Sequence, residues 1–214
     1  MYFPDTLPSS KKHPDINYPI AYTMTENVYA PPKANLAPVN ESDAARFYVV
    51  SSRKFLILFF ATLGMYQFYW FYKNWALYKR STGESIWPVL RAIFGVFFVH
   101  ALFRNVEAHN EEHSEAPWDS RSNALAVVIF LLASNGLDRL SNKSIGMPYT
   151  GWLSLLILIP LGLSELNAQG KINARCGDLS GKSNNDLTGA NIGWCVAGAF
   201  VWILVLFGLF APSI

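Results

Sequence analysis

The sequence predicts an all-α protein, an integral membrane helix bundle of four to five helices with a disordered N-terminal tail. Apolar residues make up 51% of the chain and charged residues only 15%, against about 25% in ordinary soluble domains. The charged residues also gather in clusters, which leaves long apolar gaps between them. These gaps lack the alternation of barrel strands, and backbone groups facing lipid must be satisfied within their own element, so the gaps imply helices.

Residues 1–46 are predicted to be the disordered, proline-rich tail. They show no apolar period, so they cannot bury enough apolar surface to fold. Their prolines stand between polar residues, at positions 4, 8, 14, 19, 31, 32 and 38. We prefer a solvated leader here, and the alternative is a docking motif for a soluble partner. The helix bundle then occupies residues 47–214.

The first predicted membrane segment is residues 55–72, which contain no charge over 18 residues. At about 1.5 Å per residue this run is roughly as long as the hydrocarbon core is thick. Its second half starts a run rich in aromatic side chains, which favour the membrane–water interface. We therefore expect interface anchors at Tyr66, Tyr69, Trp70, Tyr72 and Trp75.

Four further segments are predicted, near residues 86–103, 123–137, 150–166 and 189–210. The second has Pro88 near its start, where a missing N–H costs nothing. The third has only 16 uncharged residues, from 122 to 137, and is the weakest of the five. The fourth contains Pro160, which predicts a kink. The last is uncharged throughout and long enough to cross a bilayer.

The topology of the first segment has two solutions. A full crossing would put Lys73, Lys79 and Arg80 on the opposite side from Arg53 and Lys54, which the positive-inside rule disfavours. A bend near Gly64 would keep all five basic residues in the cytoplasm. We prefer the bend, which places the acidic loop of residues 107–119 on the outer side and leaves the basic connector of residues 167–186 there as well.

An aromatic motif, T-x-G-x-Y-x-x-Y-W-x-Y-K-N-W at residues 62–75, resembles a family of bacterial multi-pass inner-membrane proteins whose activity is unknown. Three shorter stretches also resemble that family. They are Asn27-x-Tyr29-Ala30-Pro31-Pro32, Arg91-Ala92-Ile93-Phe94 followed by Leu102-Phe103, and Gln169-x-x-Ile172-Asn173. The resemblance spans residues 27–210 and implies a bacterial inner-membrane location. Because the activity of that family is unknown, the resemblance gives no activity that can be carried over to this chain.

A candidate metal site lies at His109, Glu112 and His113, which match an H-x-x-E-H pattern. On a helix the two histidines would lie one turn apart and could share a zinc ion, with Glu112 as general base. The alternative, which we prefer, is a chance match in an acidic surface loop. We therefore predict no metal and no cofactor.

Three ionisable residues, Arg91, His100 and Arg104, belong to the segment at 86–103 or border it. A charge at membrane depth costs about 2.5–3.5 kcal/mol on insertion scales and is often functional. Both arginines lie near an end of the segment, where a long side chain can reach the headgroups. His100 lies deeper, and a hydrogen-bonded structural histidine is the preferred interpretation over part of a proton or solute path.

Small residues recur every four positions in the last segment, at Gly189, Gly193 and Ala197. This spacing is typical of closely packed membrane helices. We expect this face to pack inside the chain's own bundle, and the alternative is self-association.

The sequence therefore favours a non-enzymatic multi-pass inner-membrane protein with a structural or accessory role in a membrane assembly. Its expected partners are the lipid bilayer and other membrane proteins. A net charge of +2 is too small and too dispersed for nucleic-acid binding. A small transporter or channel is one alternative, and a membrane metallohydrolase using the 109–113 loop is the other.

Overall fold

The structure is a computed structural model that describes residues 46–109 and 117–210. These residues belong to one compact unit, Asn40–Ile214, and form helices without any strand. The fold class is an all-α bundle, as predicted. The predicted tail lies outside the described residues, apart from Arg46.

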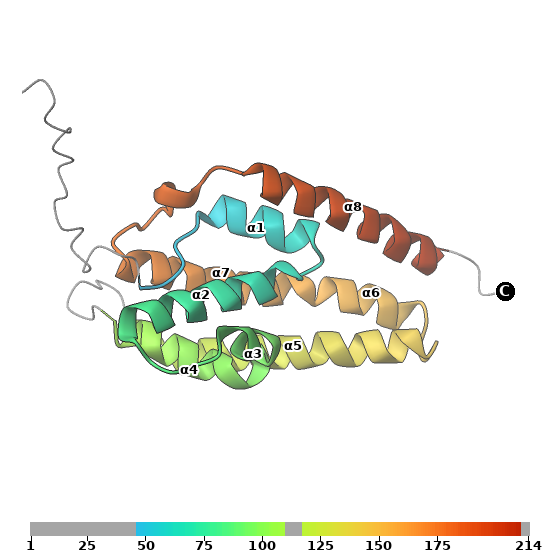
Figure 1. Ribbon diagram of the computed structural model, residues 1–214. Coiled ribbons are helices and arrows are strands. Elements are labelled where there is room, and N and C mark those ends of the chain that lie inside the picture. The colour runs from blue at the N-terminus through green and yellow to red at the C-terminus, as the bar shows by residue number, and fades with distance from the viewer. Residues whose placement is uncertain (1–45, 110–116, 211–214) are drawn as a thin grey trace, which may run out of the picture. The chain divides into compact units, whose positions relative to one another are not determined.

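Eight α-helices and one 3-10 helix are described (Figure 1). In chain order they are α1 (Ser52–Ala61), α2 (Tyr66–Thr82), α3 (Pro88–Ile93), α4 (Gly95–Glu107), α5 (Ser120–Asn142), α6 (Tyr149–Leu156), α7 (Leu158–Arg175), η3 (Lys182–Asn184) and α8 (Gly189–Phe210).

Three helices are long and apolar enough to cross a membrane, namely Ser120–Asn142, Tyr149–Arg175 and Gly189–Phe210. The second of these is α6 followed by α7, with a break at Ile157. The break comes three residues before Pro160, because a proline ring clashes with the carbonyl four residues earlier, here that of Leu156. The kink expected from the sequence thus falls just before its proline.

Residues 55–72 are not one helix, because the chain reverses between α1 and α2. Leu63 and Gly64 adopt positive φ angles of 52° and 81°, and the Gly64 N–H donates to the Phe59 carbonyl at 2.8 Å. The Thr62 hydroxyl accepts from the Tyr66 N–H at 3.0 Å and so caps α2. As a result α2 runs back along α1, and neither helix belongs to the spanning set.

This reversal buries much of the aromatic cluster that we expected at the membrane interface. Phe55 of α1 packs against Tyr66 and Trp70 of α2, with ring centroids 5.6 and 5.9 Å apart. Trp70 and Trp75 are fully buried and Tyr66 is 7% exposed, so all three are core residues rather than interface anchors. Tyr69 and Tyr72 are exposed, and the anchor role stays a prediction for these two.

The segment predicted at 86–103 is divided into α3 and α4. Gly95 lies just after the break, at a place where an added Cβ would meet the Phe71 ring at 3.2 Å. With six and 13 residues, these two helices are also outside the spanning set. The segments predicted at 123–137 and 189–210 lie within α5 and α8.

Six helix termini meet at one end of the bundle, which we call the basic end. Arg175 of α7 donates to the carbonyls of Glu107 and His109 after α4, and Ser120 of α5 donates to Glu107. Lys54 of α1 donates to Asn184 and to the Asp186 carbonyl before α8, both at 2.7 Å. Near the end of α2, Tyr78 stacks on Phe47 at 5.9 Å.

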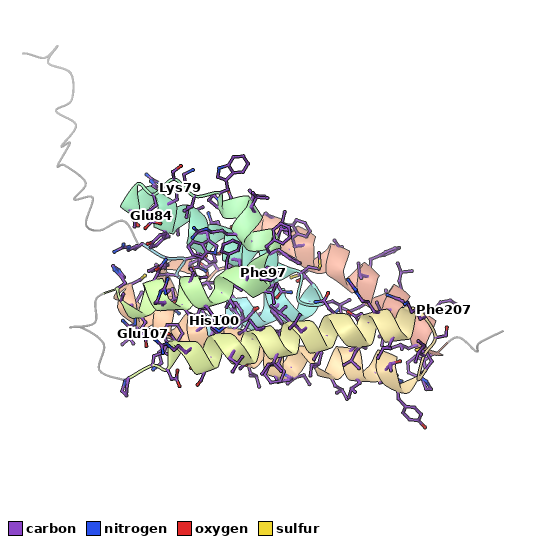
Figure 2. The ribbon with its side chains drawn as sticks, turned by 90° about the horizontal axis from the view of Figure 1, so that it is seen from below. Lys79, Glu84, Phe97, His100, Glu107 and Phe207 are labelled. Carbon is purple, nitrogen blue, oxygen red and sulfur yellow. The ribbon has the colours of Figure 1, made fainter. Side chains whose placement is uncertain are left out.

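The opposite end is formed by the last turns of α5 and α8 and the first turn of α6. Trp152 and Phe210 make a ring contact at 5.4 Å there. Figure 2 shows Lys79, Glu84 and Glu107 at the basic end and Phe207 at the opposite end. The acidic loop is therefore flanked by residues at the same end as Lys79. The bend near Gly64 that we preferred from the sequence is present, because the chain reverses at Leu63–Gly64. The expected position of the acidic loop on the other side from Lys79 is not supported, because Glu107 lies at the same end as Lys79.

Candidate functional site

The most organised polar site is an amide clamp, in which side-chain amides hold the extended segment of residues 47–51. The Val50 N–H donates to Asn173 Oδ1 at 3.3 Å, and Asn173 Nδ2 donates to the Val50 carbonyl at 2.9 Å. Asn74 accepts from the Tyr48 N–H at 3.0 Å. Gln169 donates to the Tyr48 carbonyl, also at 3.0 Å. The side-chain amides therefore satisfy the backbone N–H and C=O groups of Tyr48 and Val50, which a neighbouring β-strand would otherwise do.

Three parts of the fold supply the clamp. Asn74 comes from α2, Gln169 and Asn173 come from α7, and Asn184 of η3 donates to the Val49 carbonyl at 2.9 Å. Gln169 and Asn173 lie four residues apart on one face of α7, and Gln169 Nε2 donates to Asn173 Oδ1 at 2.7 Å. Trp70 Nε1 donates to Gln169 Oε1. These amides are committed to one another and to the backbone of residues 47–51.

Glu165 lies one turn before Gln169 on the same face of α7 and is fully buried. Neither of its carboxylate oxygens has a hydrogen-bond partner among the described residues. An ionised carboxylate without a partner is very costly in an apolar interior, so such a group takes up a proton instead. Glu165 is thus a buried acid that the amide clamp does not use.

Tyr66 of α2 is the polar neighbour of Glu165. Its hydroxyl is buried and meets no partner with good hydrogen-bond geometry, although Tyr48 lies close to it. The hydroxyl is also within electrostatic reach of Glu165. The same residue lines a groove of about 440 Å³ between α1, α2 and the start of α8, where Thr62, Tyr69 and Trp194 are further lining residues.

The structure places the three candidate ionisable residues away from Glu165. Arg91 lies over the ring of Trp75, with its guanidinium 4.2 Å from the centroid, and also over Phe98 at 5.3 Å. This cation–π packing is a structural role. His100 and Arg104 are exposed on α4, where Figure 2 labels His100. His100 has no place among the buried polar groups, so the solute path proposed for it has no support in this geometry.

The candidate metal site cannot be assembled from the described residues, because Glu112 and His113 lie outside them. His109 follows the end of α4, and its ring packs edge-on against Phe47 at 5.7 Å. Burial, followed by the positive charges of Arg46 and Arg175, lowers the pKa of His109 below its ordinary 6.5. Within residues 46–109 and 117–210 no group of three His, Cys, Asp or Glu side chains is placed to hold a metal ion.

The small-residue face of α8 does not make the helix contact that we expected. Gly189, Gly193 and Ala197 are exposed, and a Cβ added at either glycine would meet open space. Gly198 makes the contact instead, because a Cβ there would lie 2.0 Å from the Ala61 carbonyl oxygen. Trp202 adds a hydrogen bond to the Phe60 carbonyl at 2.8 Å.

Sequence reasoning missed Glu165 and the clamp, although one signal pointed to them. Glu165 is the only charged residue between Lys143 and Lys171, and Gln169 and Asn173 follow it at four-residue intervals. That spacing puts a polar stripe on an otherwise apolar helix, and such a stripe must face a partner or another helix.

Comparison with protein-family models, with curated proteins and with solved structures finds no match for the chain. The site is therefore interpreted from its own geometry.

Proposed function

We propose that this chain is a non-enzymatic, multi-pass protein of a bacterial inner membrane that acts as an accessory component of a membrane assembly. The bacterial origin rests on the resemblance of the motif at residues 62–75 to a bacterial inner-membrane family. The membrane location rests on the three long apolar helices.

One observation carries the proposal, namely the exposed apolar surface of α8. Among its 22 residues only Gly198 is buried, while large apolar side chains such as Phe200, Ile203 and Phe207 are 64–72% exposed. Soluble monomers rarely expose contiguous apolar patches of more than a few hundred Å². A lipid bilayer covers such a surface without cost, and so does a neighbouring membrane helix.

The interior supports a non-enzymatic role. Its buried amides are used to hold residues 47–51, which leaves them unavailable to bind a substrate. Within the described part of the chain, Glu165 belongs to no cluster of three or more His, Cys, Asp or Glu side chains that would supply a partner for acid–base catalysis. Within the described helices, the exposed surfaces are then the parts that can bind another membrane protein.

The distribution of basic residues supports one orientation in the membrane. Among the described residues, ten lysines and arginines lie at the basic end, and two, Arg139 and Lys143, lie at the opposite end. The ten are Arg46, Arg53, Lys54, Lys79, Arg80, Arg104, Arg121, Lys171, Arg175 and Lys182. Because basic residues flanking membrane helices remain in the cytoplasm, the basic end faces inward. α5, α6–α7 and α8 then cross the membrane three times.

The proposal is tested by photo-crosslinking in native membranes. A crosslinking amino acid replaces Phe200 on the exposed face of α8, and in a matched variant it replaces the exposed Phe97 of α4. We expect a discrete protein adduct from position 200 that position 97 does not give. If position 200 gives only lipid adducts, or if the purified protein alone shows robust turnover or solute flux, the accessory role is wrong.

A further inference from the structure

We propose that Glu165 is a proton-binding site inside the helical unit. Its carboxyl group is held in the acid form at neutral pH. The inference concerns the chemistry of one side chain and does not depend on the accessory role proposed above.

The first argument is the solvation of the carboxyl group. Glu165 has no exposed surface, and its two oxygens find no donor in the described structure. Removing a carboxylate from water without donors or a counter-charge favours the neutral acid.

The second argument is that the charged groups on the helices packed against α7 do not face Glu165. Lys54 of α1 is hydrogen-bonded at the basic end, and Glu107 of α4 accepts from Ser120. The other charged or titratable residues of α1, α4 and α5 are exposed, and α6 has only the exposed Tyr149. Those of α1, α4 and α5 are Arg53, His100, Arg104, Arg121, Asp138 and Arg139. Only tyrosines remain, namely Tyr66 and, beside it, Tyr48 and Tyr69.

The third argument is the nearest polar group. Tyr66 lines the groove and is 7% exposed, while its hydroxyl is buried and has no hydrogen-bond partner in the described structure. The hydroxyl therefore supplies neither a hydrogen bond nor a counter-charge that would favour an ionised Glu165.

Infrared spectroscopy of the full-length protein in lipid vesicles tests the protonation state. Wild type at neutral pH is expected to show a carbonyl band of a protonated carboxylic acid that Glu165→Gln lacks, with matching circular dichroism of the two proteins. Transfer to D₂O shifts that band as the proton exchanges. Identical carboxylic-acid bands in wild type and Glu165→Gln overturn the proposal.

A second measurement uses only the wild-type protein, so it holds even if Glu165→Gln does not fold. A hydrophobic carbodiimide reacts with protonated carboxyl groups in apolar surroundings. The acid proton moves to one carbodiimide nitrogen, and the carboxyl oxygen bonds to the central carbon. The adduct then rearranges to a stable N-acylurea, and no atom is lost. Peptide mapping should find the label on Glu165 and not on Glu107, whose carboxylate accepts from Ser120 at 2.6 Å. Absence of label on Glu165 contradicts the acid form.

Discussion

Asn173 is the residue on which the amide clamp depends most, because it pairs both backbone groups of Val50. Asn173→Ala removes both partners, and a buried polar group left unsatisfied costs about 1–3 kcal/mol. We expect a loss of that order or somewhat more in the free energy of unfolding, measured by denaturant titration in detergent. The matched control is Asn135→Ala, an exposed amide on α5, which should change stability by no more than about 0.5 kcal/mol. Equal effects of the two substitutions would show that the clamp contributes nothing.

Asp178 supplies a second prediction at the scale of one residue, in the connector before η3. Backbone N–H groups of Ser183 and Lys182 donate to its carboxylate at 2.8 and 2.9 Å, and these bonds lower its pKa from 3.8 to about 2. Because the folded pKa is the lower one, this stabilisation is present above pH 3.8 and is lost as the pH falls through about 2.

Asp178→Asn keeps the shape of the side chain and removes its charge, so it should flatten this part of the pH dependence. The effect is small, because Asp178 is exposed and water screens its charge. The measurement is the difference in thermal midpoint between wild type and variant from pH 5 to pH 2. A difference that does not shrink as the pH falls would rule out the carboxylate as its source.

At the scale of one helix, Gly198 determines how closely α8 approaches α1. Gly198→Ala places a methyl group against the Ala61 carbonyl, where an added Cβ has only 2.0 Å of space. Overpacking of this kind costs about 1–3 kcal/mol, and the Trp202 hydrogen bond to Phe60 should be lost as α8 moves away. Cysteine crosslinking between α8 and α1 reports the separation directly.

Gly193→Ala is the matched control on the same helix, because a Cβ there meets open space. An alanine in a helix interior is more stable than a glycine by about 0.5–1 kcal/mol, so this variant should be as stable as wild type or slightly more so. If both variants crosslink to α1 as efficiently as wild type, Gly198 does not set the distance between the helices.

Elements also show how far the sequence alone could lead. The apolar runs predicted α5 and α8 within a few residues, because length and composition decide them. The distribution of basic residues predicts the bend near Gly64, but no local pattern reveals the contacts that the reversal makes, such as Phe55 against Trp70. The burial of Trp70 and Trp75, which the sequence predicted as interface anchors, has the same cause. Their aromatic run lies on a helix that folds back against α1, so these side chains become part of the core. Apart from Asn74, the side chains of the clamp lie 121 to 135 positions from the backbone groups that they hold, so spacing alone could not predict it.

At the scale of the whole described unit, the orientation can be tested with two single cysteines in a background where Cys176 and Cys195 are serine. Ser183→Cys lies at the basic end, and Ile145→Cys lies at the opposite end; both positions are exposed. Because the basic end faces the cytoplasm, an impermeant maleimide added to intact spheroplasts should label position 145 only. Position 183 should require lysis. The reverse pattern would contradict the orientation, and labelling of both positions before lysis would contradict the three crossings.

The amide clamp has a consequence for biosynthesis. Residues 47–51 leave the ribosome long before their partners, since Gln169, Asn173 and Asn184 follow 121 to 135 residues later. Until α7 and η3 are made, most backbone groups of this segment have only water as a partner, so the segment and the start of α1 must wait at the membrane surface. Among the described helices, α1 is thus the first to be synthesised and one of the last to reach its final packing. Ribosome-stalled chains that end before Asn173 should leave it open to protease.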